Sequence, residues 1–336
     1  MAQSRSSSGA FDPTALTARL LRARALRASL AAGKAVTAYR IVDGDGDDLP
    51  GVAIDRLGEA ALLALDAGHG LGDREVTALA AIVLEVLGSD GIEAVYVKAL
   101  MRDRSRLGGQ APDEARSPTP RAGRPLARSL VVSEYDARFE VRPYDGLSTG
   151  LFLEHREHRL ALARRPPGRA LNLFAYTCAF SVPLAAAGWQ VTNVDVSGRA
   201  LDWGRRNLAL NGLPPEAARF LRRDARAFLA SAARGAERFD LVILDPPTFG
   251  AADRRRGVPA WRAVDDYPAL LQAAASVLAP DGVIFAATNT RDLASGDAFT
   301  RLVAQALGGR PRWHRLPPWP VDVTARDRVA AVLVSP

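Results

Sequence analysis

The stretch that most constrains the fold is FDLVILDPPTFG, residues 239–250. Four consecutive aliphatic residues between two aspartates are typical of a strand buried on both faces, as in a parallel sheet. Pro246 and Pro247 have a fixed φ and no backbone N–H, so they must end the strand and begin a rigid loop. The stretch therefore predicts a parallel α/β sheet with a polar loop, starting at Asp245, at the carboxyl end of one strand.

Open α/β sheets bind their ligands at this edge, outside the carboxyl ends of the strands. The carboxylate of Asp245 and the backbone carbonyl of Pro246 accept hydrogen bonds, and the ring of Phe249 offers a stacking surface. Such a loop suits a flat substrate with a polar edge, such as a nucleobase. The alternative is a strand that ends in a proline turn with a solvated aspartate.

The composition is that of an ordinary soluble chain, with 336 residues, 48% of them hydrophobic and 24% charged, which is long enough for two domains. The net charge of +7 and the pI of about 10.1 favour an anionic partner such as nucleic acid. Only Lys34 and Lys98 among the 44 basic residues are lysines. A GC-rich genome produces the same arginine excess, which weakens the charge argument.

Cysteine and histidine usage argues against disulfides and metal sites. Cys178 is the single cysteine, which excludes an intrachain disulfide and a multi-cysteine zinc site. The four histidines show no metal-ligand spacing, and no apolar run reaches the roughly 18 residues of a membrane span. We therefore expect a cytoplasmic protein without a metal or a membrane association.

Residues 1–34 predict a disordered Ser-rich tail followed by a basic helix over residues 12–32. An Arg-rich, Ser-rich and acid-poor start is also typical of an organellar transit peptide. The helix leads straight into folded sequence, which favours the first interpretation.

Residues 35–145 predict a small α+β domain, a candidate for binding RNA or another substrate. The acidic turn at residues 43–51 lacks the ligand spacing of a calcium loop and is better explained as a solvated hairpin turn. Residues 102–128 are rich in Pro, Gly and Arg and predict a flexible insertion, whose basic residues could contact phosphate. The expected strands are 38–42, 52–56, 60–65, 92–98, 129–132 and 137–141, and the expected helix is 75–87.

Residues 146–336 alternate between strand and helix patterns, which predicts a mostly parallel, doubly wound sheet with helices on both faces. The expected strands are 170–174, 191–196, 219–222, 241–245 and 283–287, with a closing pair near 312–315 and 329–334. The expected helices are 179–187, 197–210 with Ser197 as N-cap, 225–233, 263–278 and 295–307.

The turn after the first of these strands limits the choice of cofactor. A dinucleotide fold needs glycines there so that backbone amides can approach a pyrophosphate, and residues 173–187 contain none. S-adenosylmethionine carries no phosphate and remains compatible. Asp195, at the end of the second strand, could accept both ribose hydroxyls. Asp224, after the third strand, could accept from the adenine amino group or could cap the helix that begins at residue 225.

Several motifs follow one another in an order that resembles the RlmI/RlmK family of bacterial 23S rRNA methyltransferases. They include TGLFLEHREHR at 149–159, NLFAYT at 172–177, Asp195 to Asn207 with the Asn211-Gly212 pair, and DPPTF at 245–249. A further match runs from Tyr39-Arg40 through Leu49-Pro50-Gly51 to Asp55-Arg56, so the resemblance extends from residue 38 to the C-terminus. It implies S-adenosylmethionine, a Rossmann-like class I methyltransferase fold and a small α+β domain in front.

The resemblance also implies a cofactor site on the edge of the sheet. Arg156 and Arg159 would bind the cofactor's carboxylate or RNA phosphate, and a solvated helix face is the alternative. The expected cofactor-binding residues are Arg156, Asn172, Phe174, Tyr176, Thr177, Cys178, Asp195, Asp224 and Asp245.

The sequence departs from the family pattern at two places near this site. Cys178-Ala179 replaces a pair of glycines, and a cysteine is strained if the first glycine has a positive φ. Glu154-His155 replaces Asp-Gln before the arginine. A catalytically inactive RNA-binding homologue is therefore one alternative.

A third departure concerns the chemistry. The RlmI branch has, at the position of Asn289, the cysteine that cytosine-C5 transfer needs as a nucleophile. Asn289 and Arg291 are instead similar to the RlmK branch, which methylates guanine N7, a nitrogen with an exposed lone pair. We expect methyl transfer to a base nitrogen of rRNA, with guanine N7 favoured over an exocyclic amine, and a protein or small-molecule substrate is less favoured by the charge. The expected catalytic residues are Asp245, Pro246, Phe249, Asn289 and Arg291.

Overall fold

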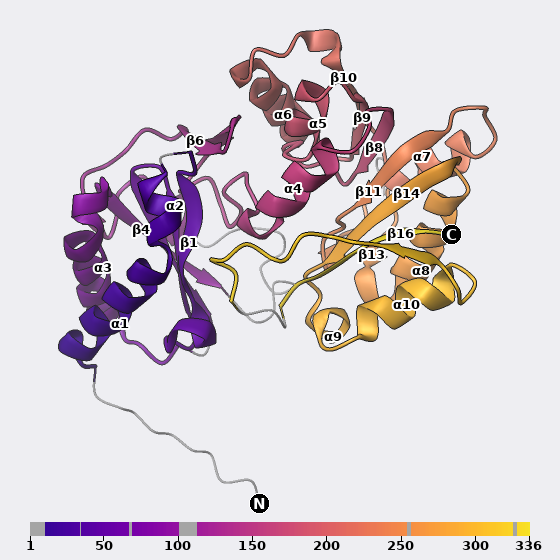
Figure 1. Ribbon diagram of the computed structural model, residues 1–336. Helices are drawn as coiled ribbons and strands as arrows, with labels where there is room; N and C mark the ends of the chain where they lie inside the picture. Colours follow the sequence, from indigo (N-terminus) through magenta and orange to yellow (C-terminus); the bar gives the residue numbers. More distant parts are fainter. Residues whose placement is uncertain (1–10, 34, 67–68, 101–112, 254–256, 325–327) are drawn as a thin grey trace, which may run out of the picture. The chain divides into compact units, whose positions relative to one another are not determined.

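The computed structural model describes residues 11–33, 35–66, 69–100, 113–253, 257–324 and 328–336, and the chain forms two compact units (Figure 1). The first comprises Met1–Leu153 and Val321–Ala325, and the second comprises Glu154–Pro320 and Arg326–Pro336. The predicted boundary near residue 145 lies within the first of these units. It also missed the return of the chain to the first unit, where the backbone N–H of Thr324 donates to Asp43 (2.7 Å).

The first unit contains a five-stranded sheet in the order β1-β2-β3-β4-β5, in which β3 and β4 are parallel and the other pairs antiparallel. A separate hairpin pairs β6 with β7. The predicted α+β organisation is confirmed. The elements are α1 (Pro13–Leu26), α2 (Ala28–Ala32), β1 (Ala38–Asp43), η1 (Gly44–Asp47), β2 (Val52–Leu57), β3 (Ala60–Asp66), α3 (Asp73–Leu87), η2 (Gly88–Asp90), β4 (Ala94–Leu100), η4 (Asp113–Arg116), β5 (Ala122–Gly123), β6 (Leu130–Glu134) and β7 (Ala137–Val141).

The basic helix near the N-terminus belongs to the core of this unit. Leu20 and Ala23 of α1 are buried in the same hydrophobic cluster as Leu79 and Val83 of α3, and Figure 1 shows the two helices close together. The predicted helix over 12–32 is interrupted at Arg27, which has φ −102° and ψ 9° and lies between α1 and α2. The helix thus folds as part of this unit, while residues 1–10 lie outside the described part of the chain.

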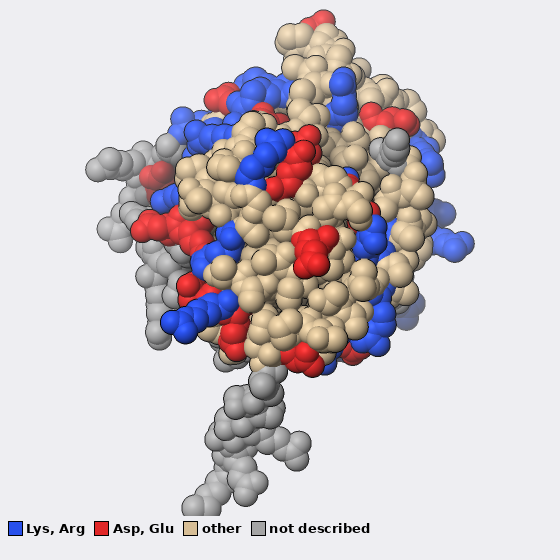
Figure 2. All heavy atoms as spheres, turned by 90° about the vertical axis from the view of Figure 1, so that its left-hand side faces the viewer, with Lys and Arg blue, Asp and Glu red and all other residues tan. Residues whose placement is uncertain are grey.

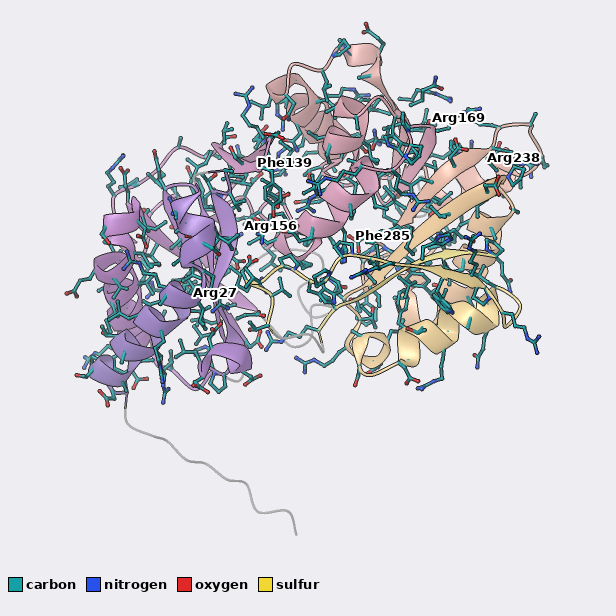
Figure 3. All side chains as sticks on the ribbon, viewed as in Figure 1. Arg27, Phe139, Arg156, Arg169, Arg238 and Phe285 are labelled. Atoms are coloured by element: carbon teal, nitrogen blue, oxygen red, sulfur yellow. The ribbon has the colours of Figure 1, made fainter. Side chains whose placement is uncertain are left out.

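The acidic turn at 43–51 is not the solvated turn that the sequence predicts. Asp47 is buried and accepts from both terminal nitrogens of Arg27, at 2.5 and 2.7 Å, and from the backbone N–H of Asp43. Figure 3 labels Arg27 inside this unit. The turn is therefore held by a buried ion pair between segments 20 residues apart.

The structure describes residues 113–128 of the predicted insertion at 102–128, and they include a short strand. Residues 101–112 lie outside the described part, but β5 pairs with β4 at the edge of the sheet. Gly123 has φ +90°, and a Cβ there would lie 2.1 Å from the carbonyl oxygen of Glu93, so only glycine fits. Because this segment is rich in Pro and Gly, the sequence did not predict the short edge strand β5.

The second unit contains a seven-stranded sheet in the order β10-β9-β8-β11-β14-β16-β15. The first five strands are parallel and β16 is antiparallel to both its neighbours, which confirms the mostly parallel sheet. The strands are β8 (Arg169–Leu173), β9 (Gln190–Asp195), β10 (Ala218–Arg222), β11 (Phe239–Leu244), β14 (Leu278–Thr288), β15 (Arg312–His314) and β16 (Ala330–Ser335), with a small ribbon of β12 (Phe249–Gly250) and β13 (Trp261–Arg262).

Helices cover both faces of this sheet (Figure 1). Buried side chains of α7, α8 and α10 share one hydrophobic cluster with β11 and β14. Among the described residues, no helix is both long and apolar enough to cross a membrane. The helices and 3-10 turns are η5 (Leu153–His155), α4 (Arg156–Ala163), α5 (Ser181–Ala186), α6 (Gly198–Leu210), η6 (Pro215–Ala217), α7 (Ala225–Ala232), α8 (Ala263–Ala275), α9 (Arg291–Ala294) and α10 (Ala298–Ala306).

The buried ion pair of the first unit gives a stability prediction. We expect Asp47→Asn to lower the free energy of unfolding by about 3 kcal/mol, because it leaves the buried charge of Arg27 uncompensated. Asp48→Asn removes the same charge from an exposed residue of the same turn and should change stability by less than about 0.5 kcal/mol. Urea denaturation of both variants measures the difference, and equal stabilities would contradict the assigned role of the pair.

Candidate active site

The order of strands in the second unit reverses between β8 and β11, which are adjacent and parallel. Leu173 and Leu244, their last residues, are paired in register. The segments that follow, beginning at Phe174 and Asp245, therefore leave the sheet side by side. In doubly wound sheets, this point of reversal is where ligands bind.

The turn after β8 is held in an unusual backbone conformation by Asp195. Phe174, Tyr176 and Cys178 all have positive φ, at 55°, 47° and 59°. Asp195, at the end of β9, accepts from the backbone N–H of Tyr176 and from that of Ser197, both at 2.8 Å. Left-handed non-glycine residues cost about 1 kcal/mol or more each, so the neighbouring structure must enforce this turn.

Asp195 keeps the capacity to accept further hydrogen bonds, because each carboxylate oxygen offers two acceptor sites. Burial raises its pKa above the ordinary value, and backbone N–H donors oppose that shift. Ser197 caps α6 by accepting from Ala200, as the sequence predicts. Asp224 caps α7 by accepting from Ala227, so one of its two predicted roles is observed directly.

The side chain of Asn172 points into a buried polar network rather than toward a ligand. Its amide nitrogen donates to Ser181 (2.9 Å) and to Asn193 (3.2 Å). The carbonyl oxygen of Thr177 accepts from the side chain of Asn207 (2.9 Å). These hydrogen bonds stabilise the turn and occupy the side chain of Asn172 within the protein. The geometry therefore does not favour binding of the cofactor by this side chain.

The loop after β11 is fixed by two aromatic residues that the sequence did not single out. The indole N–H of Trp261 donates to the carbonyl of Pro247 (2.6 Å). The hydroxyl of Tyr267 lies 3.1 Å from the carbonyl oxygen of Leu244 and 2.7 Å from that of Ala287, which links the ends of β11 and β14. No periodic pattern in the sequence marks either aromatic residue as a partner of this loop.

The predicted substrate residues gather beside this loop. Phe249 is 67% exposed, and the hydroxyl of Thr248 donates to the side-chain oxygen of Asn289 (2.9 Å). Phe249 and Arg291 line one cavity of about 230 Å³. Its lining residues are Thr248, Phe249, Arg262, Val264, Thr290, Arg291 and Asp292.

Asp245 lies at the start of the loop with 25% of its side chain exposed. Burial, and then the negative charge of Glu154, raise the pKa of Asp245 to about 7, while Arg159 acts in the opposite direction. Nε2 of His155 lies 3.6 Å from its Oδ2. A carboxyl group with this pKa accepts or releases a proton near neutral pH.

Arg156 and Arg159 of α4 are both buried, so the alternative of a solvated helix face is wrong. Nε of Arg156, labelled in Figure 3, lies 3.3 Å from Oε1 of Glu157. The guanidinium of Arg159 lies 5.7 Å from the ring centre of Phe180. Buried arginines on the helix before β8 remain candidates for holding an anionic group.

The comparisons with known proteins agree with this architecture. The model of the S-adenosylmethionine-dependent methyltransferase family matches residues 110–312. Over 299 residues the chain is 32% identical to ribosomal RNA large subunit methyltransferase I of Klebsiella pneumoniae (strain 342), which covers 88% of this chain and 71% of that protein. The chain belongs to the RlmI-type family of S-adenosylmethionine-dependent methyltransferases. The expected closeness to the guanine-N7 branch is not supported by such relatives.

Solved structures show the same fold. A methyltransferase of Streptococcus mutans superposes with a TM-score of 0.82 at 22% identity, covering 98% of this chain and 82% of that one. The methyltransferase SMU.776 in complex with SAH gives a TM-score of 0.83 at 23% identity, with 98% and 83% covered. The cofactor of this RlmI-type enzyme is S-adenosylmethionine, as predicted.

The cysteine that replaces a family glycine fits because another glycine faces it. Cys178 has a positive φ, which is the strain that the sequence predicted. Its Sγ is buried, and a Cβ on Gly204 of α6 would lie 2.4 Å from that sulfur. The cysteine side chain thus occupies space next to α6, and burial raises the pKa of its thiol well above the ordinary value.

This pairing gives a testable prediction for the cofactor turn. We expect Gly204→Ala to destabilise the enzyme by about 2 kcal/mol and to weaken S-adenosylmethionine binding, because the new methyl group overlaps Sγ of Cys178. The double variant with Cys178→Gly should recover most of both losses. Urea denaturation and calorimetric titration measure the two effects, and a Gly204→Ala protein as stable as the parent would contradict the packing argument.

The raised pKa of Asp245 predicts a pH-dependent stability. The folded state holds this proton more tightly than the unfolded state, so the contribution of Asp245 to stability is complete below about pH 4 and is lost as the pH rises to about 7. We expect Asp245→Asn to raise the free energy of unfolding by about 2 kcal/mol at pH 8. This value allows for screening by solvent, because the side chain of Asp245 is partly exposed. At pH 5 the increase in the free energy of unfolding should be much smaller. Urea denaturation at both pH values measures it, and equal increases would contradict the raised pKa of Asp245.

Proposed function

We propose that this enzyme transfers the methyl group of S-adenosylmethionine to a ring or exocyclic nitrogen of a nucleobase in large-subunit ribosomal RNA, with guanine N7 favoured. The observation that carries the proposal is the loop at 245–249, which starts at the partly exposed carboxylate of Asp245 and ends at the exposed ring of Phe249. Phe249 and Arg291 line one cavity, and Thr248 of its lining donates to the amide oxygen of Asn289. A substrate in ribosomal RNA is supported by the similarity to ribosomal RNA large subunit methyltransferase I, and it would place the enzyme in the cytoplasm.

The position of the only cysteine argues for nitrogen rather than cytosine C5 as the acceptor. C5 transfer needs a thiolate that attacks the base. Cys178 is buried beside α6, and the pKa of its thiol is raised, which disfavours the thiolate. Asn289, beside the cavity, has no nucleophilic group. A base nitrogen, which already has its lone pair, fits this set of residues.

In this proposal the residues of the loop act by positioning. Asp245 and the carbonyl of Pro246 hold the edge of the base, and Phe249 stacks on its face after the base has left its own stack. Asn289 and Arg291 orient the base or its phosphate. Positive charge develops on the base as the methyl group arrives, and the carboxylate of Asp245 stabilises it.

An exocyclic amine is the second candidate because of one observation. Amine methylation releases a proton, and Asp245, with a pKa of about 7, could accept it. Guanine N7 releases no proton. The two candidates therefore differ in whether the reaction requires Asp245 as a base.

The net charge of +7 fits an RNA substrate. The positive side chains, however, do not form a basic patch on every face. On the face shown in Figure 2, the Lys and Arg side chains of the described residues lie among Asp and Glu side chains. We therefore base the proposal on the loop and its cavity rather than on a basic surface.

Mass spectrometry of the modified nucleosides tests the proposal. Ribosomal RNA from a strain that lacks the gene is incubated with the enzyme and isotope-labelled S-adenosylmethionine. We expect label in 7-methylguanosine, and label in an exocyclic-amine product would support the second candidate. Label in 5-methylcytidine, or in protein alone, would overturn the proposal.

The exposed ring of the loop gives a mutational prediction. We expect Phe249→Ala to lower kcat/KM for RNA about tenfold or more, because stacking on an aromatic side chain contributes about 1–3 kcal/mol per base. Folding stability and S-adenosylmethionine affinity should stay unchanged, since the ring is largely exposed. Trp313→Ala, which removes an exposed aromatic ring from β15, is the matched control and should keep full activity. Equal activities of the two variants would argue against stacking.

A further inference from the structure

Two buried histidines lie next to Asp245 at the start of α4. His155 and His158 are 3% and 2% exposed. Their rings pack among three aromatic residues, with the ring centre of His155 5.9 Å and that of His158 4.6 Å from Trp319. Phe180 and Phe285 complete the enclosure, and Figure 3 labels Phe285 on β14. The pair is therefore shielded from water.

The two imidazoles and the carboxylate of Asp245 form a row. Nδ1 of His155 lies 3.1 Å from Nδ1 of His158, within hydrogen-bond distance. On the opposite side of the same ring, Nε2 of His155 lies 3.6 Å from Oδ2 of Asp245. This second distance is longer than a hydrogen bond, and such contacts in ligand-free sites often shorten when substrate binds.

The contact between the two Nδ1 atoms requires one proton, carried by one of the two rings. Two protonated Nδ1 atoms would repel, and two unprotonated ones would have no donor. Burial lowers the pKa of His155 well below its ordinary value and that of His158 to about 4, and the charge of Arg159 adds to both shifts. Both rings are thus neutral at pH 7, and each must be the tautomer that complements the other.

Each tautomer of His155 matches one protonation state of Asp245. If His158 donates its Nδ1–H, His155 carries its proton on Nε2 and can donate to the carboxylate of Asp245. If His155 donates its Nδ1–H instead, its Nε2 is an acceptor and suits a protonated Asp245. Three other groups act on Asp245 or its surroundings: Glu154, Arg159 and the hydroxyl of Tyr267.

We propose that His155 is a positioning residue that orients Asp245 and, in the tautomer in which His158 donates to it, holds Asp245 as a carboxylate when the base binds. This inference rests on the proposed function, in which Asp245 holds the base edge. In the carboxylate-bound arrangement, Nε2–H of His155 donates to Oδ2, which leaves Oδ1 for the substrate.

A matched pair of substitutions at His155 separates the two ring nitrogens. The amide nitrogen of Gln reaches about as far as Nε2, whereas that of Asn reaches only about as far as Nδ1. We expect His155→Gln to keep the midpoint of the pH dependence of kcat. His155→Asn should move that midpoint upward by about one pH unit, because Asp245 loses a donor that favours its charged form. S-adenosylmethionine binding and thermal stability, measured on both variants, establish that each is folded.

A second readout does not depend on methyl transfer. Carboxyl-carbon NMR of protein labelled at aspartate, with Asp245→Asn to assign the signal, gives the titration midpoint of Asp245 in the parent and in both His155 variants. A higher midpoint in His155→Asn than in His155→Gln supports the inference, even if Asp245→Asn retains methyl transfer and the proposed function is wrong. Equal midpoints in the two variants would overturn the inference and leave the proposed function standing.

Discussion

The hydrogen bonds that Trp261 and Tyr267 make with backbone carbonyls hold the active-site loop in place. Pro246 and Pro247 have no N–H groups, so neither residue can donate a backbone hydrogen bond that would fix the start of the loop. The indole of Trp261 donates to the Pro247 carbonyl, and the hydroxyl of Tyr267 joins the ends of β11 and β14. Because both donors are rigid and buried, the position of Asp245 follows from the packing of α8 against the sheet.

The turn after β8, which leaves the sheet beside this loop, is rigid for a different reason. There, Asp195 accepts two backbone N–H groups and keeps a turn with three left-handed non-glycine residues in place. The side chain of Cys178 fits beside Gly204, so the loss of a family glycine leaves the turn intact. In the proposed function, cofactor and substrate would bind at these two segments, whose limited freedom suits a reaction that depends on proximity and orientation.

The strands and helices of the second unit were predictable because their patterns are local. The aliphatic run of β11 ended at the proline pair, and Ser197 and Asp224 cap helices where the sequence expects caps. The first unit was less predictable. Its acidic turn is buried because Arg27, far away in the sequence, supplies the opposite charge, and β5 is too short to show a pattern.

The sequence by itself determined the doubly wound sheet, the phosphate-free cofactor turn and the loop at Asp245, since each depends on residues that are neighbours in the chain. Only the tertiary structure decided what surrounds them. Trp261 follows Pro247 by 14 residues, and His155 precedes Asp245 by far more, with no periodicity linking either pair. Such contacts arise when strands distant in sequence are placed side by side, so burial, tautomers and shifted pKa values become visible only in the folded chain.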